Sequence, residues 1–429
     1  MRQRSETVRK SPSVAAHEDS PGDTVFIARQ PVFNRRLTVC GYELLFRSRP
    51  SAEANVSDDL AATAHVLRTT FLELGLSELT GGLPALVNFA APHLIEQLPL
   101  LFPPQWLVVE VLESVAPDPP LYEALLLLRG HGYRIALDDV TTVDLPDPFL
   151  RLADIVKVDF LALTSEQRVR TTHSLRNRCS RGIRFLAEKV ESRTDMQEAH
   201  AMGYHYFQGF FFARPELRSG KTIPSHKLTL LQLLREISNP EFEYSRLDRI
   251  IKADVGLTTK LLTYINAAAF PWSRRIESVK QALVLLGESQ IRKWISLVTL
   301  GEMASDKPLE LVRLACFRGR WLELLHSRLR EYTELECFLV GALANLDAIL
   351  DVSLEEALER VSPPEAVVTA LQGGDSRLGN ALRSALAYER GDWDQVVLWA
   401  TRAGLQVEEL SRTYRESLAW TEKLFSAGT

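Results

Sequence analysis

Five acidic side chains and one amide fall where short β-rich segments of the sequence end. The segments read VCGYELLFR, PALVNFA, QWLVVEVLES, YRIALDDV and IRFLAEKV, and helix-like stretches separate them. A carboxylate at the end of one buried strand is costly, and a single one is often simply solvated. The same placement repeated along a β/α chain predicts that the side chains converge on one face. They are Glu43, Asn88, Glu110, Asp138, Asp139 and Glu188.

This set of oxygen atoms suits a hard divalent cation. Mg²⁺ and Mn²⁺ prefer oxygen ligands, which carboxylates and an amide carbonyl supply. The adjacent Asp138 and Asp139 allow one strand end to reach two metal ions roughly 4 Å apart, an arrangement typical of phosphate-ester chemistry. Lys157, in the segment IVKVD, is placed to hold or polarise an attacking water. Glu191 and Gln208 are expected to support the site or to contact the ligand.

Residues 25–215 must supply the strands that position these side chains. Short β-rich runs alternate there with longer amphipathic runs, one of them near residues 59–76, and several helical runs close on a glycine directly before the next strand. Repeated β/α units indicate a parallel sheet, and this many units favour a closed, TIM-like (β/α) barrel.

The second half of the chain has a different texture. Beyond residue 221 the strand-like runs disappear, and leucine, isoleucine, valine and alanine recur at helical spacing. We therefore predict an α/β domain followed by an all-α domain. The expected division is a disordered tail at 1–24, the barrel at 25–215, a linker punctuated by glycine and proline at 216–226, and the helical domain at 227–429.

The composition limits the partners and the location. The chain has 429 residues, a formal net charge of -5 and a pI near 6.1, so it has no global basic field, and no direct nucleic-acid binding is expected. No apolar run reaches the roughly 18 residues needed to cross a bilayer. Residues 1–24 lack the apolar centre of a secretory signal, and the four cysteines form no CxxC pair. We expect a soluble, cytoplasmic protein without a membrane span.

Seven sequence motifs, in order, resemble those of the EAL domain. CGYELLFR is similar to the EAL signature, VNF to its Asn motif, EVLES to its Glu-x-x-Glu motif and LDDV to its Asp-Asp motif, and VKVD, AEKVES and QGFFFARP match the next three. EAL domains are (β/α) barrels that hydrolyse cyclic di-GMP to the linear dinucleotide with two Mg²⁺ or Mn²⁺ ions. The opening ARQPVFN followed by YELLFR resembles the subgroup that is fused to an HDOD domain.

The resemblance implies a role for each matched residue. Four would bind the first metal ion: Glu43, Asn88, Glu110 and Asp138. Two would serve the second ion, one as a ligand and one as a supporting carboxylate: Asp139 and Asp159. Two would order the nucleophilic water: Lys157 and Glu188. Three would contact the dinucleotide: Gln30, Arg47 and Gln208.

The loop after Asp139 departs from the family pattern. Active members usually read Asp-Asp-Phe-Gly-Thr-Gly, whereas this chain reads DDVTTV, and β-branched residues resist backbone angles that glycine reaches. Glu113, which steadies that loop in the family, is present. Leu44 adds bulk beside the first ligand, and Lys189 replaces a glycine next to Glu188. The ligands thus survive, while the loop that organises them does not.

The helical half resembles HDOD domains, relatives of HD phosphohydrolases that lack the metal-binding His-Asp pair. AAAFPWSRRIESVKQALVLLG is similar to the HDOD core, and GALANLDA places Ala344 and Asn345 where an HD enzyme carries that pair. Without an imidazole and a carboxylate, no HD-type metal site forms there. The resemblance implies a non-catalytic module that binds a protein partner or relays a signal.

Three functions agree with these motifs. The favoured hypothesis is a signalling protein whose barrel binds cyclic di-GMP with the help of metal, with weak or lost hydrolysis, and relays its state to the helical domain. The first alternative is an active phosphodiesterase that makes linear pGpG with two Mg²⁺ or Mn²⁺ ions. The second is a scaffold that acts only by protein contacts, independently of nucleotide. EAL domains often pair through the loop that is altered here, so the sequence does not decide between a monomer and a homodimer.

Overall fold

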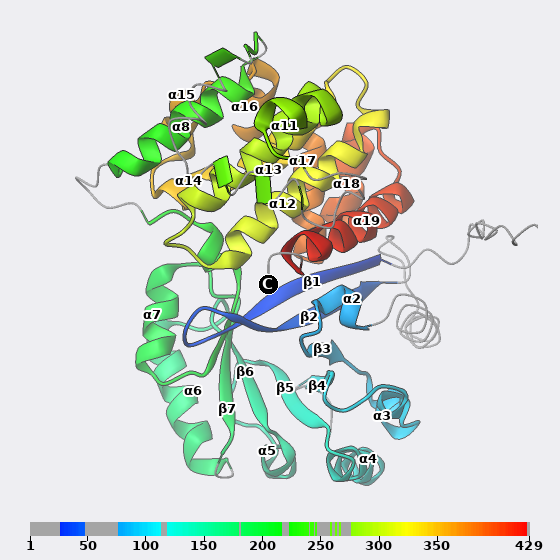
Figure 1. Cartoon of the computed structure of the whole chain (residues 1–429). Helices are drawn as coiled ribbons and strands as arrows, with labels where there is room; N and C mark the ends of the chain where they lie inside the picture. The colour runs from blue at the N-terminus through cyan, green and yellow to red at the C-terminus, as the bar shows by residue number, and fades with distance from the viewer. Residues whose placement is uncertain are drawn as a thin grey trace, which may run out of the picture.

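The structure is a computed structural model. It describes residues 26–47, 76–112, 118–179, 182–216, 223–239 and 276–426, with short pieces between 241 and 266. The tail expected at 1–24, Glu113 and nearly all of the run near 59–76 lie outside the described residues. Figure 1 shows a barrel surrounded by helices and a second body, made of helices, packed on one side of it.

Eight strands close into a barrel in the order of the chain. They are β1 (Phe26–Asn34), β2 (Val39–Arg47), β3 (Ala85–Asn88), β4 (Leu107–Leu112), β5 (Arg134–Val140), β6 (Ile155–Asp159), β7 (Arg184–Glu188) and β8 (Tyr206–Gln208). The strands from β2 to β8 are parallel to their neighbours in this series, and β1 is antiparallel to both β2 and β8. The predicted closed barrel is confirmed.

The first two strands form a hairpin, so the expectation of a parallel sheet was wrong for β1. Only residues 35–38 separate β1 from β2, whereas a parallel connection needs roughly a dozen residues or more. The turn is stabilised locally, because Asn34 Oδ1 accepts hydrogen bonds from the backbone N–H groups of Arg36 (2.8 Å) and Thr38 (3.2 Å). Leu37 has a φ of 57°, which reverses the chain direction.

Three of the helices around the barrel, α4, α6 and α7, begin at side chains that cap them. Asp118 accepts a hydrogen bond from a backbone N–H in the first turn of α4 (3.0 Å), and Thr164 and Gln167 form a capping box at the start of α6. Gly132 and Gly203 follow α4 and α7 with φ of 89° and 81°, as the helix-ending glycines predict. The elements are α2 (Leu76–Thr80), α3 (Ala91–Ile95), η1 (Leu98–Leu101), α4 (Pro119–Gly130), α5 (Asp147–Leu152), α6 (Ser165–Arg178), α7 (Arg193–Ala201) and η2 (Phe210–Ala213).

The faces of the strands that carry the site residues also carry a layer of apolar residues directly beside them. The apolar layer is a cluster of buried side chains: Val32, Leu86, Val108, Ala136, Ile155 and Leu186. Side chains alternate between the two faces of a strand, so the residue two positions away faces the same way. Two positions after the last five lie Asn88, Glu110, Asp138, Lys157 and Glu188, and two positions before Val32 on the antiparallel β1 lies Gln30. The fold therefore sets the site residues directly beside an apolar plug.

All elements that the structure describes after residue 223 are helices, which confirms the all-α prediction. They are α8 (Ser225–Ser238), α11 (Val279–Met303), α12 (Leu309–Leu324), η3 (His326–Arg328), α13 (Glu334–Leu343), α14 (Leu346–Leu350), α15 (Leu354–Val361), α16 (Glu365–Leu371), α17 (Arg377–Glu389), α18 (Trp393–Ala403) and α19 (Val407–Ser426). α11 is kinked at Gly287, where φ is 77° and ψ is 167°. No helix in the described ranges is both long and apolar enough to cross a membrane.

The helical domain covers the β1–β2 hairpin, which has no crossover helix of its own. In Figure 1, β1 and β2 form the side of the barrel that faces α12 and α19. β8 pairs with β1 only at residues 32–34, so the earlier backbone donors of β1 need other partners. The N–H of Ile27 donates to Tyr388 Oη on α17 (3.3 Å), and that of Arg29 donates to Tyr414 Oη on α19 (3.1 Å). The helices thus complete the hydrogen bonding of a barrel strand.

Candidate metal centre

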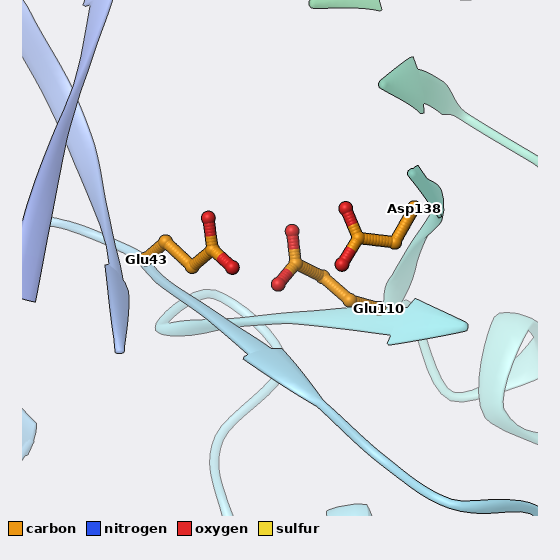
Figure 2. Close-up of side chains that lie close together, drawn as sticks. All are labelled: Glu43, Glu110 and Asp138. Atoms are coloured by element: carbon orange, nitrogen blue, oxygen red, sulfur yellow. The ribbon is translucent and has the colours of Figure 1, made fainter. Parts of the chain in front are cut away.

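Carboxylates from separate strands meet toward the carboxyl ends of the parallel strands. Oxygen atoms of Glu43 on β2, Glu110 on β4 and Asp138 on β5 lie within 4.8 Å of one another, and Figure 2 shows the three carboxylates gathered in one space. A second group, Asp138, Asp139 and Glu188, meets the same limit. Asp138 belongs to both groups, which is the arrangement needed for a residue that bridges two ions. The role of each residue as a ligand remains a prediction.

Lys157 lies among these carboxylates. Its Nζ is 2.5 Å from Glu110 Oε1, 2.6 Å from Asp138 Oδ1, 2.8 Å from Glu188 Oε1 and 3.3 Å from Glu43 Oε2. The side chains of Lys157 and Glu110 are both fully buried. Four carboxyl groups therefore surround one ammonium group, and when all four are ionised their excess negative charge favours a further cation.

Burial dominates the ionisation of this cluster. It raises the pKa of Glu110 and of Glu188 well above the ordinary value of 4.5, although Lys157 opposes the shift. Burial also disfavours the ionised form of Asp138, but Lys157 outweighs it and the pKa of Asp138 is lowered. Burial likewise disfavours the ammonium form of Lys157, and the surrounding carboxylates reverse this and raise its pKa. A metal ion that binds here must therefore compete with protons for the two glutamates.

Several buried oxygen atoms of the site accept no hydrogen bond from the described residues. They are Asn88 Oδ1, Glu188 Oε2, Gln208 Oε1 and both carboxylate oxygens of Glu110, one of which contacts Lys157 as an ion pair. A buried oxygen without a donor is costly, and coordination to a cation would satisfy it. Carboxylates together with one amide oxygen fit Mg²⁺ or Mn²⁺.

Both aspartates of the DDV segment reach the site because β5 is irregular there. Consecutive residues of a regular strand point to opposite faces. The register between β5 and β6 shifts between Leu137 and Val140, and Asp139 has a φ of 51°, in the left-handed region. The backbone N–H of Asp139 donates to Asp138 Oδ1 (3.0 Å). This bulge, for which the sequence carried no clear signal, brings Asp139 beside Asp138 and Glu188.

The residues expected to contact the nucleotide lie on neighbouring strands around Glu43. Gln208 Nε2 donates to Glu43 Oε2 (2.5 Å) and to Gln30 Oε1 (3.2 Å). Arg47 is half-buried at the end of β2 and is an even number of positions beyond Glu43, so it belongs to the same face of that strand. The structure thus brings Gln208 into direct contact with the first metal group, and Gln30 into contact with Gln208.

The two supporting acids have different surroundings. Asp159 Oδ1 accepts hydrogen bonds from two backbone N–H groups of the turn that follows β6 (2.8 and 2.9 Å), and its Oδ2 lies 2.7 Å from Lys189 Nζ. Glu191 pairs with Arg214 (2.9 Å), and both side chains are about half exposed. Asp159 is therefore held in place by the backbone, whereas Glu191 belongs to a surface ion pair. Lys189 also contacts Asp139, which the sequence alone did not indicate.

In the helical domain, Asn345 belongs to a buried ion-pair network. Arg318 Nη1 donates to Asn345 Oδ1 (2.8 Å), while Arg318 Nε and Nη2 donate to the two carboxylate oxygens of Glu389 (2.7 and 2.5 Å). All three side chains are buried. The position where an HD enzyme would carry an aspartate thus binds a guanidinium group, which cannot act as a metal ligand.

Comparisons with known proteins identify both parts of the chain. The EAL domain model matches residues 84–215, and the HDOD domain model matches residues 223–361. The protein named cyclic di-GMP phosphodiesterase CdgJ, from Vibrio cholerae, is 33% identical over 406 residues, which cover 94% of this chain and 93% of that protein. Uncharacterized protein YuxH of Bacillus subtilis is 31% identical over 411 residues, covering 94% of this chain and 99% of that protein. The chain belongs to the family of proteins that join an EAL domain to an HDOD domain.

Solved structures show a more distant likeness. The Bacillus subtilis YkuI protein, with an EAL domain, in complex with substrate c-di-GMP and calcium, is 19% identical with a TM-score of 0.37, and the match covers 62% of this chain and 72% of that chain. The calcium and cyclic di-GMP complex of Klebsiella pneumoniae BlrP1 is 23% identical with a TM-score of 0.36, covering 47% of this chain and 58% of that chain. Family membership follows from the full-length relatives.

Proposed function

We propose that this protein binds cyclic di-GMP at the carboxylate cluster with the help of a divalent metal ion, hydrolyses it weakly or not at all, and relays the bound state to its helical domain. The observation that carries this proposal is the buried cluster in which two groups of three oxygen ligands share Asp138. The name of the relative CdgJ supports the same nucleotide. A metal ion, when bound, supplies a Lewis acid for a phosphate oxygen and for a water molecule.

The other residues of the site bind and orient the nucleotide and the water. The fork of Arg47 matches two phosphate oxygens at once. The amides of Gln30 and Gln208 offer both donors and acceptors to the nucleotide. Lys157 and Glu188, whose Nζ and Oε1 atoms lie 2.8 Å apart, are the groups that would hold the water.

Weak hydrolysis is expected because the second half of the site is altered. Residues 140–143 read VTTV and contain no glycine. Asp139, a candidate ligand of the second ion, is engaged by Lys189 at 2.7 Å. In two-metal chemistry both ions must be placed to activate the attacking water and to stabilise the leaving oxygen.

The alternative, an active phosphodiesterase, is favoured by one specific observation. CdgJ, which carries that activity in its name, is 33% identical over nearly the whole length of both proteins. An incubation of the purified protein with cyclic di-GMP and Mn²⁺ separates the two proposals. We expect tight binding in calorimetry and little linear dinucleotide, and Glu43→Ala should weaken binding because the first group loses a ligand. Turnover that disappears in Glu43→Ala would instead establish the enzyme, and no heat of binding with or without Mg²⁺ would favour the scaffold.

The proposed relay has a physical route along β1. Gln30 contacts Gln208 on the ligand side, and its Nε2 donates to the backbone carbonyl of Glu389 at the end of α17 (3.4 Å). The preceding residue, Arg29, faces the other way and pairs with Glu422 on α19 (2.9 Å). A ligand couples to the helical domain only if it binds two arrangements of these contacts with different affinity.

Hydrogen exchange tests the relay. Cyclic di-GMP is expected to change the protection of backbone amides in α17 and α19 as well as in the barrel, because both helices contact β1. The same measurement on Glu43→Ala is the control, since the change should vanish when the nucleotide no longer binds. A change that is confined to the barrel would contradict the relay and leave nucleotide binding intact.

Metal ions are expected to stabilise the protein in a pH-dependent manner. If ions bind only the folded barrel, Mg²⁺ at about 100 times its dissociation constant adds roughly 2.7 kcal/mol. Without metal, folded Glu110 and Glu188 hold protons above the ordinary pKa of 4.5, so their contribution to stability is greatest in acid and is lost as the pH rises through their raised pKa values. Because Mg²⁺ needs the deprotonated carboxylates, the increase in melting temperature should be larger at about pH 8 than at about pH 5.5. Equal increases at both pH values would argue against this assignment.

A further inference from the structure

We infer that Lys189 takes the place of the second divalent cation, so that this barrel binds one metal ion tightly instead of two; the inference rests on the proposed function. Lys189 directly follows Glu188 at the end of β7. Its Nζ lies 2.7 Å from Asp139 Oδ1 and 2.7 Å from Asp159 Oδ2. The ammonium group thus bridges two carboxylates, Asp139 on β5 and Asp159 at the end of β6, as a bound cation would.

Lys189 competes for the second group of oxygen ligands and not for the first. The second group consists of Asp138, Asp139 and Glu188, and Asp139 is the member that Lys189 engages. Lys157 contacts all three members of the first group and also Asp138 and Glu188 of the second, so it bears on both groups, whereas Lys189 bears on the second alone. A divalent ion at the second group would share the Asp139 carboxylate with a positive charge, and like charges at such a short separation repel each other. The resulting loss of affinity falls on the second ion.

The two carboxylate contacts hold Lys189 in this position against a strained backbone. Asp159 is a rigid acceptor, because its other oxygen accepts two backbone hydrogen bonds and only 6% of the residue is exposed. The backbone of Lys189 has a φ of 50°, a left-handed conformation that glycine adopts freely and that strains a lysine. Such strain persists where surrounding contacts outweigh it, and here the contacts are the two carboxylates.

Glu188 shows that the second position still has a ligand to offer. The Glu188 carboxyl group lies against Asp138, and its buried Oε2 accepts no hydrogen bond in the part of the chain that the structure describes. Its other oxygen lies 2.8 Å from Lys157. Removing the charge of Lys189 would release Asp139 and complete the second group around this oxygen. The single side chain at position 189 therefore sets the number of ions.

A titration of the metal-free protein with Mn²⁺ tests this inference by stoichiometry. Calorimetry counts the ions, and electron paramagnetic resonance detects the spin coupling of two Mn²⁺ ions roughly 4 Å apart. The unaltered protein is expected to bind one ion tightly and to give an uncoupled spectrum. Lys189→Met keeps the aliphatic stem without the charge, and it should bind a second ion at least tenfold more tightly than the unaltered protein and give a coupled spectrum.

Two control variants separate charge from general disturbance. Lys189→Arg keeps the positive charge and should still bind one ion. Arg193→Met removes a partly exposed ion pair with Glu216 on the same barrel (3.4 Å) and should leave the stoichiometry unchanged. Two tight ions in the unaltered protein, or one in Lys189→Met with an unchanged melting temperature, would overturn the inference and leave the first metal site standing. No Mn²⁺ bound to either protein would overturn the proposed function itself.

Discussion

Replacing Lys157 with methionine is expected to lower the free energy of unfolding of the metal-free protein by about 3–5 kcal/mol. The ammonium group is fully buried and lies between 2.5 and 3.3 Å from four carboxylates, so its removal leaves buried negative charge without a partner. The loss should be smaller at low pH, where Glu110 and Glu188 take up protons readily because their pKa values are raised. Denaturant unfolding followed by circular dichroism, with a chelator present, measures it.

A second buried lysine provides the matched control. Lys293 in α11 pairs with Glu323 (2.5 Å) and Glu334 (3.1 Å), far from the barrel site in sequence, and Lys293→Met should also destabilise the protein. Mg²⁺ is expected to restore stability to Lys157→Met and not to Lys293→Met. At position 157 the ion can bind the surrounding carboxylates and replace the positive charge that the substitution removes. Equal recovery in both variants, or none in either, would contradict the assignment of the cluster as a metal site.

Replacing Gly341 with alanine should destabilise the helical domain by about 3 kcal/mol or more. A Cβ at this position of α13 would fall well inside van der Waals distance of the carbonyl oxygen of Arg318 and 2.5 Å from the backbone nitrogen of Gly319, both on α12. Backbone atoms cannot rotate away as a side chain can, so the two helices would have to separate. That movement would also disturb the buried pair of Arg318 with Glu389.

Gly301 is the matched control for this substitution. It lies inside the helix α11, and a Cβ there would meet only Val312 Cγ1, at an ordinary 3.8 Å. Gly301→Ala should therefore be neutral or stabilising by about 0.5–1 kcal/mol, because alanine loses less backbone entropy in a helix. Thermal melts of both variants test this explanation. The melting temperature of Gly341→Ala should be clearly lower than that of Gly301→Ala, and similar values for the two would refute close packing at Gly341.

Local sequence patterns sufficed for the barrel, for the all-α half and for the positions of the site residues along their strands. Each of these depends on alternation or helical spacing over a few consecutive residues, and the two-residue period alone sets Glu110 beside Val108 and Asp138 beside Ala136. The antiparallel direction of β1 could also have been predicted from the sequence. The short connection at 35–38 carried that signal, since parallel strands cannot be joined by so few residues.

Contacts between distant parts of the chain left no comparable signal. Asp139 reaches the site through a bulge in β5, although regular alternation would turn it away from Asp138. Lys189 meets Asp159 and Asp139, which precede it by 30 and 50 residues. No window of sequence contains these partners together, because closure of the barrel alone makes them neighbours.

The covering of β1 by the last helices also constrains how the protein is made. Ile27 bonds to Tyr388 across 361 residues of sequence, and Arg29 bonds to Tyr414 across 385. At about 5–20 residues per second, a ribosome needs roughly 20–80 seconds to travel from the first partner to the last. Throughout that interval the backbone donors and the apolar flank of this strand are exposed to water, because the helices that cover them do not yet exist. The first strand to leave the ribosome is therefore among the last to complete its hydrogen bonds and packing. Chaperones have correspondingly long access to it.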